Sequence, residues 1–328
     1  MAYTTINDPT AFFQTILYTG NATDDRSISG VGFQPDWLWV KERSATSGHI
    51  IVDSIRGATK FIQSHNTTAE DTNADIIQAF ESDGFEIGTH GAINENTQTY
   101  VAWNWKAGTS FTNDASATSV GSVDSAGSVS TDAGFSIINV VKNNTTAHTV
   151  AHGLGAVPQM IIGKSRTGSS YRWIVYHKDI GNTHALYLNE NFVKTDSVTF
   201  WNDTTPTSSV FSLGTDNSWN GTSIFYCFAE KQGYSKFGSY TGNNDDNGTF
   251  VYTGFKPAFV MVKITAGQTD NWIMQDNKIN SFNGASSQRL RPNSSGAEFS
   301  SSNEIDLLSN GFKTHGADGE INGSGFSY

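Results

Sequence analysis

The chain has a single cysteine, Cys227, among 328 residues. An internal disulfide is therefore excluded, and the apolar run IFYCFAE around Cys227 is typical of a buried structural thiol. Basic residues are also scarce: 20 lysines and arginines stand against 31 acidic residues, which gives a formal charge of −11. Phosphate backbones and anionic membrane surfaces would be repelled, so we expect no nucleic-acid partner.

Long apolar runs and helical spacing are equally sparse. The N-terminal MAYTTINDPTAFFQ lacks a basic segment followed by an apolar core, and no eighteen apolar residues run together. We expect neither a signal peptide nor membrane insertion. Only 16% of the residues are charged and 32 are glycine, which favours a turn-rich β-protein. The segment 71–80, DTNADIIQAF, is the best candidate for a short helix.

One sequence motif occurs three times in the chain. A proline precedes a lysine by six positions in GFQPDWLWVK (32–41), PQMIIGK (158–164) and GFKPAFVMVK (254–263). In the first copy Trp37 and Trp39 alternate with Leu38 and Val40, so both faces of this strand are apolar and we expect it to be buried on both sides. The repetition indicates a tandem architecture.

Further elements follow the proline-led strand in the same order. Each copy has a second apolar strand, in HIIVDS (49–54), RWIVYH (172–177) and NWIMQD (271–276). Two copies close with an aromatic strand, YVAWNWKAG (100–108) and SIFYCFAEKQG (223–233). The third copy stops at GSGFSY (323–328), so its last strand is either clipped or completed by another part of the structure.

These patterns predict an all-β protein of three tandem repeats of about 100 residues, each an antiparallel β-sandwich, with few short helices. The predicted boundaries are an N-terminal arm (1–13), repeat 1 (14–108), a Ser/Thr/Gly-rich linker or exposed hairpin (109–133), repeat 2 (134–233) and repeat 3 (234–328) with a truncated last strand.

The motifs taken together resemble a repeat of virion structural and tail-fibre proteins of marine tailed bacteriophages. Those that carry the resemblance are YTGN, GFQPDWLWVK, RGATKFIQS, SDGFEIG and YVAWNWKAG in the first copy, GNTHALYLN, FWNDTTPTSSVFSLGT and FYCFAE in the second, and FGSYTGN and GFKPAFVMVK in the third. The resemblance implies a lectin-like, jelly-roll type of sandwich displayed on the particle, and it carries over no catalytic residue.

On this interpretation the protein is a non-enzymatic virion surface protein, made in the host cytoplasm. It would act either as a tail appendage or fibre knob for host attachment, or as a capsid decoration. The expected partners are other virion proteins and a host-surface glycan or receptor, and the expected assembly is a homo-oligomer, with a trimer favoured.

The alternative is a glycan-degrading enzyme. ESDGFE, with Glu81, Asp83 and Glu86, matches the Glu-x-Asp-x-x-Glu pattern of sandwich-fold glucanases, in which two carboxylates act as nucleophile and general acid. The other copies place turn residues and a strand at this point. Asp83 is therefore more simply part of a turn, and the glutamates are solvated.

Acidic pairs follow YTGN in two copies, at Asp24 and Asp25 and at Asp245 and Asp246. They suggest a surface Ca²⁺ site, or ordinary turns built on Asp and Asn side chains. An EF-hand is excluded because the position of its bidentate glutamate is Gly254. We expect no other cofactor, since no histidine pair has zinc-site spacing.

Glycan recognition by a sandwich needs exposed aromatic faces beside amides and carboxylates. Two loops, FWNDTTP (200–206) and DNSWNGT (216–222), combine these groups. Trp219 is the best candidate because it sits within a polar loop, and the others are Trp201, Asn217, Asn220, Asp203 and Tyr171.

Overall fold

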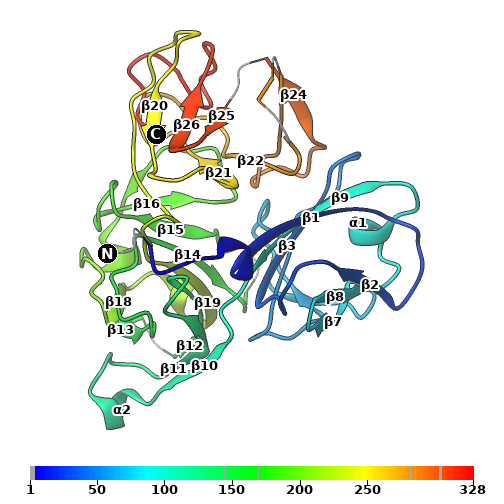
Figure 1. The fold of residues 1–328 in the computed structure, drawn as a ribbon. Helices are drawn as coiled ribbons and strands as arrows, with labels where there is room; N and C mark the ends of the chain where they lie inside the picture. The colour runs from blue at the N-terminus through cyan, green and yellow to red at the C-terminus, as the bar shows by residue number, and fades with distance from the viewer. Residues whose placement is uncertain (1–3, 144, 169, 281–282, 285, 303–304) are drawn as a thin grey trace.

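The computed structural model describes residues 4–143, 145–168, 170–280, 283–284, 286–302 and 305–328. The chain is all-β, with antiparallel sheets and few short helices, as predicted. Its strands gather into three lobes around a common centre (Figure 1). We call them lobe 1 (residues 13–107), lobe 2 (109–230) and lobe 3 (234–328). None of the described helices is long and apolar enough to span a membrane.

Lobe 1 follows a short 3₁₀-helix, η1 (Pro9–Ala11). Its elements are β1 (Phe13–Thr19), β2 (Arg26–Ser29), β3 (Trp37–Glu42), β4 (Ile50–Asp53), β5 (Lys60–Phe61), β6 (Asp71–Thr72), β7 (Ile77–Glu81), β8 (Gly84–Ile87), α1 (Gly91–Asn94) and β9 (Thr99–Trp105). One sheet has the order β1-β9-β3-β4 and the other β2-β8-β7. Leu38 and Val40 of β3 pack between the sheets against Phe85 and Ile87 of β8.

Lobe 2 has the same plan with a wider sheet. Its elements are β10 (Thr109–Asn113), α2 (Ala115–Thr118), β11 (Ser125–Ser130), β12 (Phe135–Lys142), β13 (His148–Ala151), β14 (Met160–Ser165), β15 (Ile174–His177), β16 (His184–Tyr187), β17 (Thr195–Asp196), α3 (Val198–Trp201), β18 (Val210–Leu213), η2 (Asn217–Trp219) and β19 (Gly221–Phe228). The large sheet has the order β10-β11-β12-β19-β14-β15-β16-β17, and β13 pairs with β18. Segment 109–133 contributes β10 and β11, which extend this sheet at one edge.

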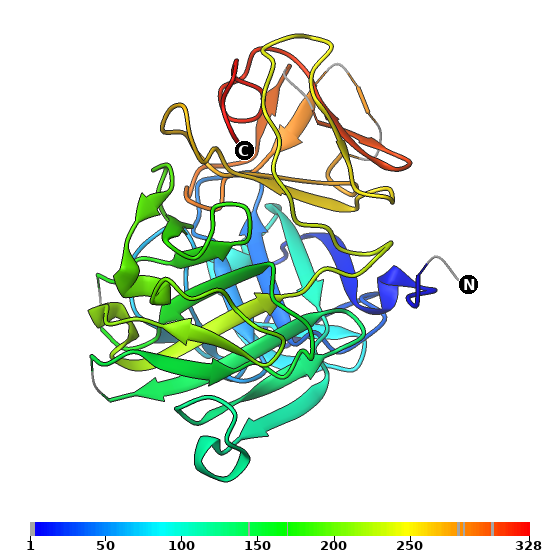
Figure 2. The ribbon, with the colours of Figure 1, turned by 90° about the vertical axis from the view of Figure 1, so that its left-hand side faces the viewer.

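Lobe 3 contains β20 (Phe250–Tyr252), β21 (Phe259–Val262), β22 (Ile273–Asp276), β23 (Ser287–Arg289), β24 (Phe299–Ser301), β25 (Ile305–Leu308) and β26 (Gly311–Thr314). Three described strands, β20-β26-β25, form one sheet, whereas β21 pairs only with β22. In the views of Figures 1 and 2 this lobe lies above the other two.

The segment 71–80 is not a helix, so that prediction is wrong. It contains β6 and the start of β7, which pairs with β8 in an antiparallel hairpin. The register shifts between Ile77 and Ala79, and this bulge gives the apolar residues a spacing unlike the alternation of a regular strand.

The proline-led strand of lobe 1 is buried on both faces, as predicted, because every residue of β3 is buried. In lobe 2 every residue of β14 is buried as well. One face of each strand points into its own sandwich. The other face meets its counterparts from the neighbouring lobes in a shared aromatic and aliphatic cluster at the centre of the molecule. In this cluster Trp37 stacks on Tyr226 with ring centroids 4.5 Å apart, and the ring centroids of Trp105 and Phe259 are 5.9 Å apart.

A hydrogen bond recurs across each seam between lobes. The residue before the second apolar strand donates a ring N–H to a main-chain carbonyl of the adjacent lobe. The three bonds run from His49 Nε2 to Arg291 O (3.0 Å), from Trp173 Nε1 to Gln63 O (2.9 Å) and from Trp272 Nε1 to Tyr187 O (2.9 Å). The three lobes therefore surround the centre with an approximate threefold relation.

Three lysines occupy a second equivalent position, at the end of each proline-led strand. Lys41, Lys164 and Lys263 are buried, and burial lowers the pKa of each to about 8. Their ammonium groups donate to main-chain carbonyls; Lys164 Nζ, for example, lies 3.2 Å from the Thr67 carbonyl oxygen of lobe 1. Burial of these lysines lowers the free energy of unfolding while they are charged.

This burial predicts a pH dependence of stability. Between pH 8 and about 10 the unfolded chain, with lysine pKa near 10.4, binds more protons than the folded protein, so the free energy of unfolding rises with pH. Lys164→Met should remove on the order of 1 kcal/mol per pH unit of that slope near pH 9. Urea titrations at a series of pH values measure it. The exposed Lys194 provides the matched control, Lys194→Met, and an equal change in both variants would contradict the assignment.

Candidate binding site

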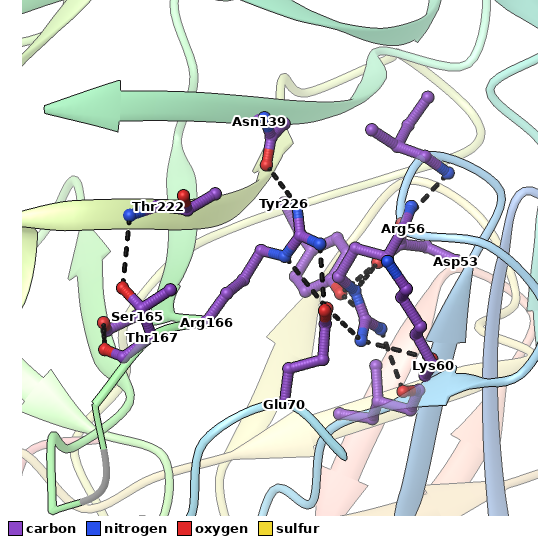
Figure 3. A network of polar contacts seen from close by, with 12 residues as sticks. Asp53, Arg56, Lys60, Glu70, Asn139, Ser165, Arg166, Thr167, Thr222 and Tyr226 are labelled. Carbon is purple, nitrogen blue, oxygen red and sulfur yellow. Dashed lines mark hydrogen bonds and ion pairs between the residues drawn. The ribbon is translucent and has the colours of Figure 1, made fainter. Parts of the chain in front are cut away.

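A network of charged side chains lies between lobes 1 and 2 (Figure 3). Tyr226 Oη donates to Asp53 Oδ2 over 2.7 Å, and Asp53 also accepts from Arg56 Nε. Glu70 lies 3.4 Å from Arg56 Nη1 and receives two bonds of 2.9 Å from Arg166. The side chains of Asp53 and Arg56 have no solvent exposure, so the centre of this network gives a substrate no access, whereas Glu70 and Arg166 are 13% and 15% exposed.

Electrostatics also mark this network as structural. Burial alone would lower the pKa of Arg56, but the charge of Asp53 raises it above its ordinary value, so the guanidinium stays charged. Burial raises the pKa of the Tyr226 hydroxyl, which stays protonated and remains a donor. A fully paired, solvent-free ion pair of this kind holds two lobes in register and offers no group poised to exchange a proton near neutrality.

The best candidate for a functional site is an apolar cavity of about 820 Å³ at the meeting point of the three lobes. This volume lies within the range of ligand-binding pockets. Lobe 3 supplies one wall through segments 234–240 and 250–263, and lobes 1 and 2 supply the other. The lining is mainly apolar and includes Trp105, Phe135, Phe228, Phe237, Phe259 and Met261.

Large apolar side chains are exposed beside this cavity. Phe250 is 44% and Tyr252 61% exposed, and both line it. Contiguous exposed apolar surface on a protein marks a place where another molecule binds. A polar group at the opposite wall is His177, whose Nδ1 accepts from the Asp179 N–H over 3.3 Å and whose pKa burial lowers.

The predicted catalytic carboxylates lie elsewhere. Glu81 ends β7 and accepts from Ser27 Oγ over 2.8 Å, while Glu86 is in β8. Asp83 accepts the backbone N–H groups of Gly30 (3.1 Å) and Gly32 (2.6 Å). Asp83 thus connects the turn to the neighbouring loop, which agrees with its interpretation as a turn residue. None of the three acids lines the cavity.

The expectation that Trp219 presents a face to solvent is wrong. Trp219 is 0% exposed, its Nε1 donates to the Phe200 carbonyl over 3.0 Å, and its ring packs 5.6 Å from Trp201, which is 2% exposed. Both rings belong to the core of lobe 2. The polar candidates Asn217, Asn220 and Asp203 are exposed, and Tyr171 is half-buried.

The acidic pairs after YTGN are exposed in both lobes. Asp24 Oδ1 accepts from Gln78 Nε2 over 2.9 Å, and Asp245 Oδ1 accepts from the Asn247 N–H over 2.7 Å. The bond to Asp245 is typical of a turn built on an Asp side chain, which is the alternative to a Ca²⁺ site given above. Within the described part of the chain no three His, Cys, Asp or Glu side chains gather to hold a metal, and Ca²⁺ binding at Asp24, Asp25, Asp245 and Asp246 stays a prediction.

Comparison with known families places almost the whole chain in one of them. Residues 8–328 match the family described as Domain of unknown function (DUF7483), and the chain belongs to that family. No curated protein matches the sequence. The family description supplies no activity, so the functional argument depends on the geometry of the protein itself.

The buried network predicts a large loss of stability when one partner is removed. Asp53→Asn leaves the Arg56 charge in a solvent-free site with only Glu70 nearby, and should lower the free energy of unfolding by about 3–5 kcal/mol. Denaturant titration followed by tryptophan fluorescence measures this loss. The control is Glu230→Gln, which breaks partly exposed pairs with Lys178 and Lys236 and should cost less than about 1 kcal/mol. Similar losses in the two variants would refute the structural role.

Proposed function

We propose that the protein is a non-enzymatic structural protein of a bacteriophage virion surface. It would serve as a tail appendage or fibre knob for host attachment, or as a capsid decoration. The observation that carries this proposal is the nature of the cavity: an apolar hollow beside the edge of β21, suited to joining polypeptides rather than to chemistry on a polar substrate. The sequence resemblance to phage virion repeats points the same way.

The distribution of ionisable groups supports a binding role over a catalytic one. Asp53 and Arg56, at the centre of the charged network, have no solvent exposure, and the acids of ESDGFE are separated from the cavity. A glycosidase would need two carboxylates facing one accessible cleft. Other virion proteins are the proposed partners, with a homo-oligomer, a trimer by preference, as the proposed assembly. Exposed loop groups at Asn217, Asn220 and Asp203 would offer hydrogen bonds to a host-surface glycan or receptor.

The location on a particle is testable directly. An antibody raised against this chain should label intact virions of the phage that encodes it in electron micrographs, because a surface protein exposes its loops to solvent. Virions that lack the protein, obtained by deleting its gene, serve as the control. Label confined to the lysate, with none on purified particles, would contradict the proposal.

The enzymatic alternative has its own test. The purified protein should release no sugar from a laminarin-type β-glucan, and Glu81→Gln and Glu86→Gln should leave that result unchanged. Reducing-sugar release measured over time is the readout. Release by the unmodified protein that disappears in either variant would instead establish a glycan-degrading enzyme at ESDGFE.

A further inference from the structure

Each of the three lobes has an equivalent short strand at one edge of a sheet. These strands are β2, β13 and β20, and each carries an aliphatic residue that packs into its own sandwich. This residue lies opposite a phenylalanine of the paired strand: Ile28 opposite Phe85, Val150 opposite Phe211, and Val251 opposite Phe312. The residues on either side of the aliphatic position therefore correspond in the three lobes.

In lobe 2 a segment of the same chain covers this edge. The flanking positions of β13 are Thr149 and Ala151. Ser122 N–H donates to the Thr149 carbonyl over 2.8 Å, and Ser125 Oγ donates to the Ala151 carbonyl over 2.9 Å. The backbone groups of the two flanking positions thus point away from β18, and this edge binds an extended segment.

In lobes 1 and 3 no described segment bonds to this edge in that way, and the flanking side chains differ in kind. In β2 they are Ser27 and Ser29, both exposed and polar. In β20 they are Phe250 and Tyr252, whose rings are exposed beside the apolar cavity. Natural proteins protect an edge strand with polar side chains or with a covering segment. Since β20 has neither, its edge is suited to pairing with another strand.

The backbone at the edge of β20 has the direction that such pairing needs. Thr314 N–H of β26 donates to the Thr249 carbonyl over 3.0 Å, so this carbonyl faces β26. The direction of the backbone groups alternates along an antiparallel strand. Val251 therefore also faces β26, whereas the backbone groups of Phe250 and Tyr252 face away from it, as those of their counterparts in lobe 2 do.

Charges on the two sides of β20 indicate which partner fits the strand. The exposed Asp245 and Asp246 precede it, and the exposed Lys256 follows it. Asp246 lies five positions before Val251, and Lys256 lies five positions after it. A second copy that pairs antiparallel with β20, centred on Val251, would bring its acidic turn to this lysine and its lysine to this acidic turn. Such complementary charges favour this partner and this register.

We propose that β20 is a self-association surface, at which a second copy of this chain pairs antiparallel with β20 about a twofold axis through Val251. Phe250 of each copy would lie directly opposite Tyr252 of the other, on the same face of the sheet. Their outward-facing backbone groups would exchange hydrogen bonds, and cross-strand aromatic pairs add stability. The sheets β20-β26-β25 of the two copies would join into one continuous sheet.

This inference rests on the homo-oligomer of the proposed function, but not on its location on a virion, which antibody labelling tests separately. A twofold contact uses the same patch on both copies. It therefore closes with two copies and builds a dimer, and a trimer cannot close through this contact alone.

Light scattering on the full chain over a range of concentrations tests the surface. The unmodified protein should be a dimer. Phe250→Ser combined with Tyr252→Ser gives β20 the residues that β2 has at these positions, so the lobe should still fold, which circular dichroism checks. This double variant should be a monomer, with self-association weaker by about tenfold or more. The matched control is Phe192→Ser, which removes an exposed ring of lobe 2 and should leave the dimer intact.

Two results would overturn the proposed surface. One is an unmodified protein that is monomeric or trimeric throughout the concentration range. The other is a double variant that dimerises as tightly as the unmodified protein.

Charge reversal tests the register. Asp246→Lys should weaken the dimer by about threefold or more, because attraction turns into repulsion in both pairs. A general charge effect would act in the opposite direction, since this substitution reduces the net charge of −11. Adding Lys256→Asp should restore the original dissociation constant. A dimer that Asp246→Lys leaves unchanged or tightens, or that the second reversal does not restore, would contradict the antiparallel pairing about Val251.

Discussion

The arrangement of the molecule depends on a hydrogen bond repeated at each seam, in which a ring N–H at the start of an apolar strand reaches a carbonyl of the neighbouring lobe. A buried ring nitrogen without a partner would cost free energy, so the ring fixes where the neighbouring main chain must lie. Histidine replaces tryptophan at one seam. His49 can do so because its Nδ1 accepts from Trp39 Nε1 over 2.8 Å, which leaves the proton on Nε2. The aromatic cluster packs in the space these bonds define.

Several charged groups at the seams between the lobes are paired in the same way. Asp53, Arg56 and Tyr226 satisfy one another without water, and the buried lysines direct their ammonium groups at main-chain carbonyls. These ionisable residues therefore stabilise the contacts between lobes. What is left for a partner is an apolar sheet edge, and the contrast between these paired groups and the open edge is the basis of the proposed binding role.

Local sequence predicted the strands well because alternation of large apolar residues, as in Trp37 to Val40, leaves little choice of structure. It failed at 71–80, where a bulge in β7 gave Ile76, Ile77 and Phe80 a spacing that resembles one face of a helix. It also failed at Trp219, since a polar loop can fold its one large ring inward, and Asn217 and Asn220 on either side stay exposed. The cavity could not be predicted because its walls come from three lobes far apart in sequence.

The approximate threefold body is made from one covalent chain, and this changes how its seams respond to concentration. In a trimer of separate subunits each seam forms only as often as subunits meet, whereas here the lobes are tethered and meet at an effective concentration set by short connections. The body should therefore persist at any dilution. Because the three lobes have separate sequences within one chain, each seam can also change independently of the other two. The charged network holds only lobes 1 and 2, so the remaining seams are free to evolve different strengths and different openings.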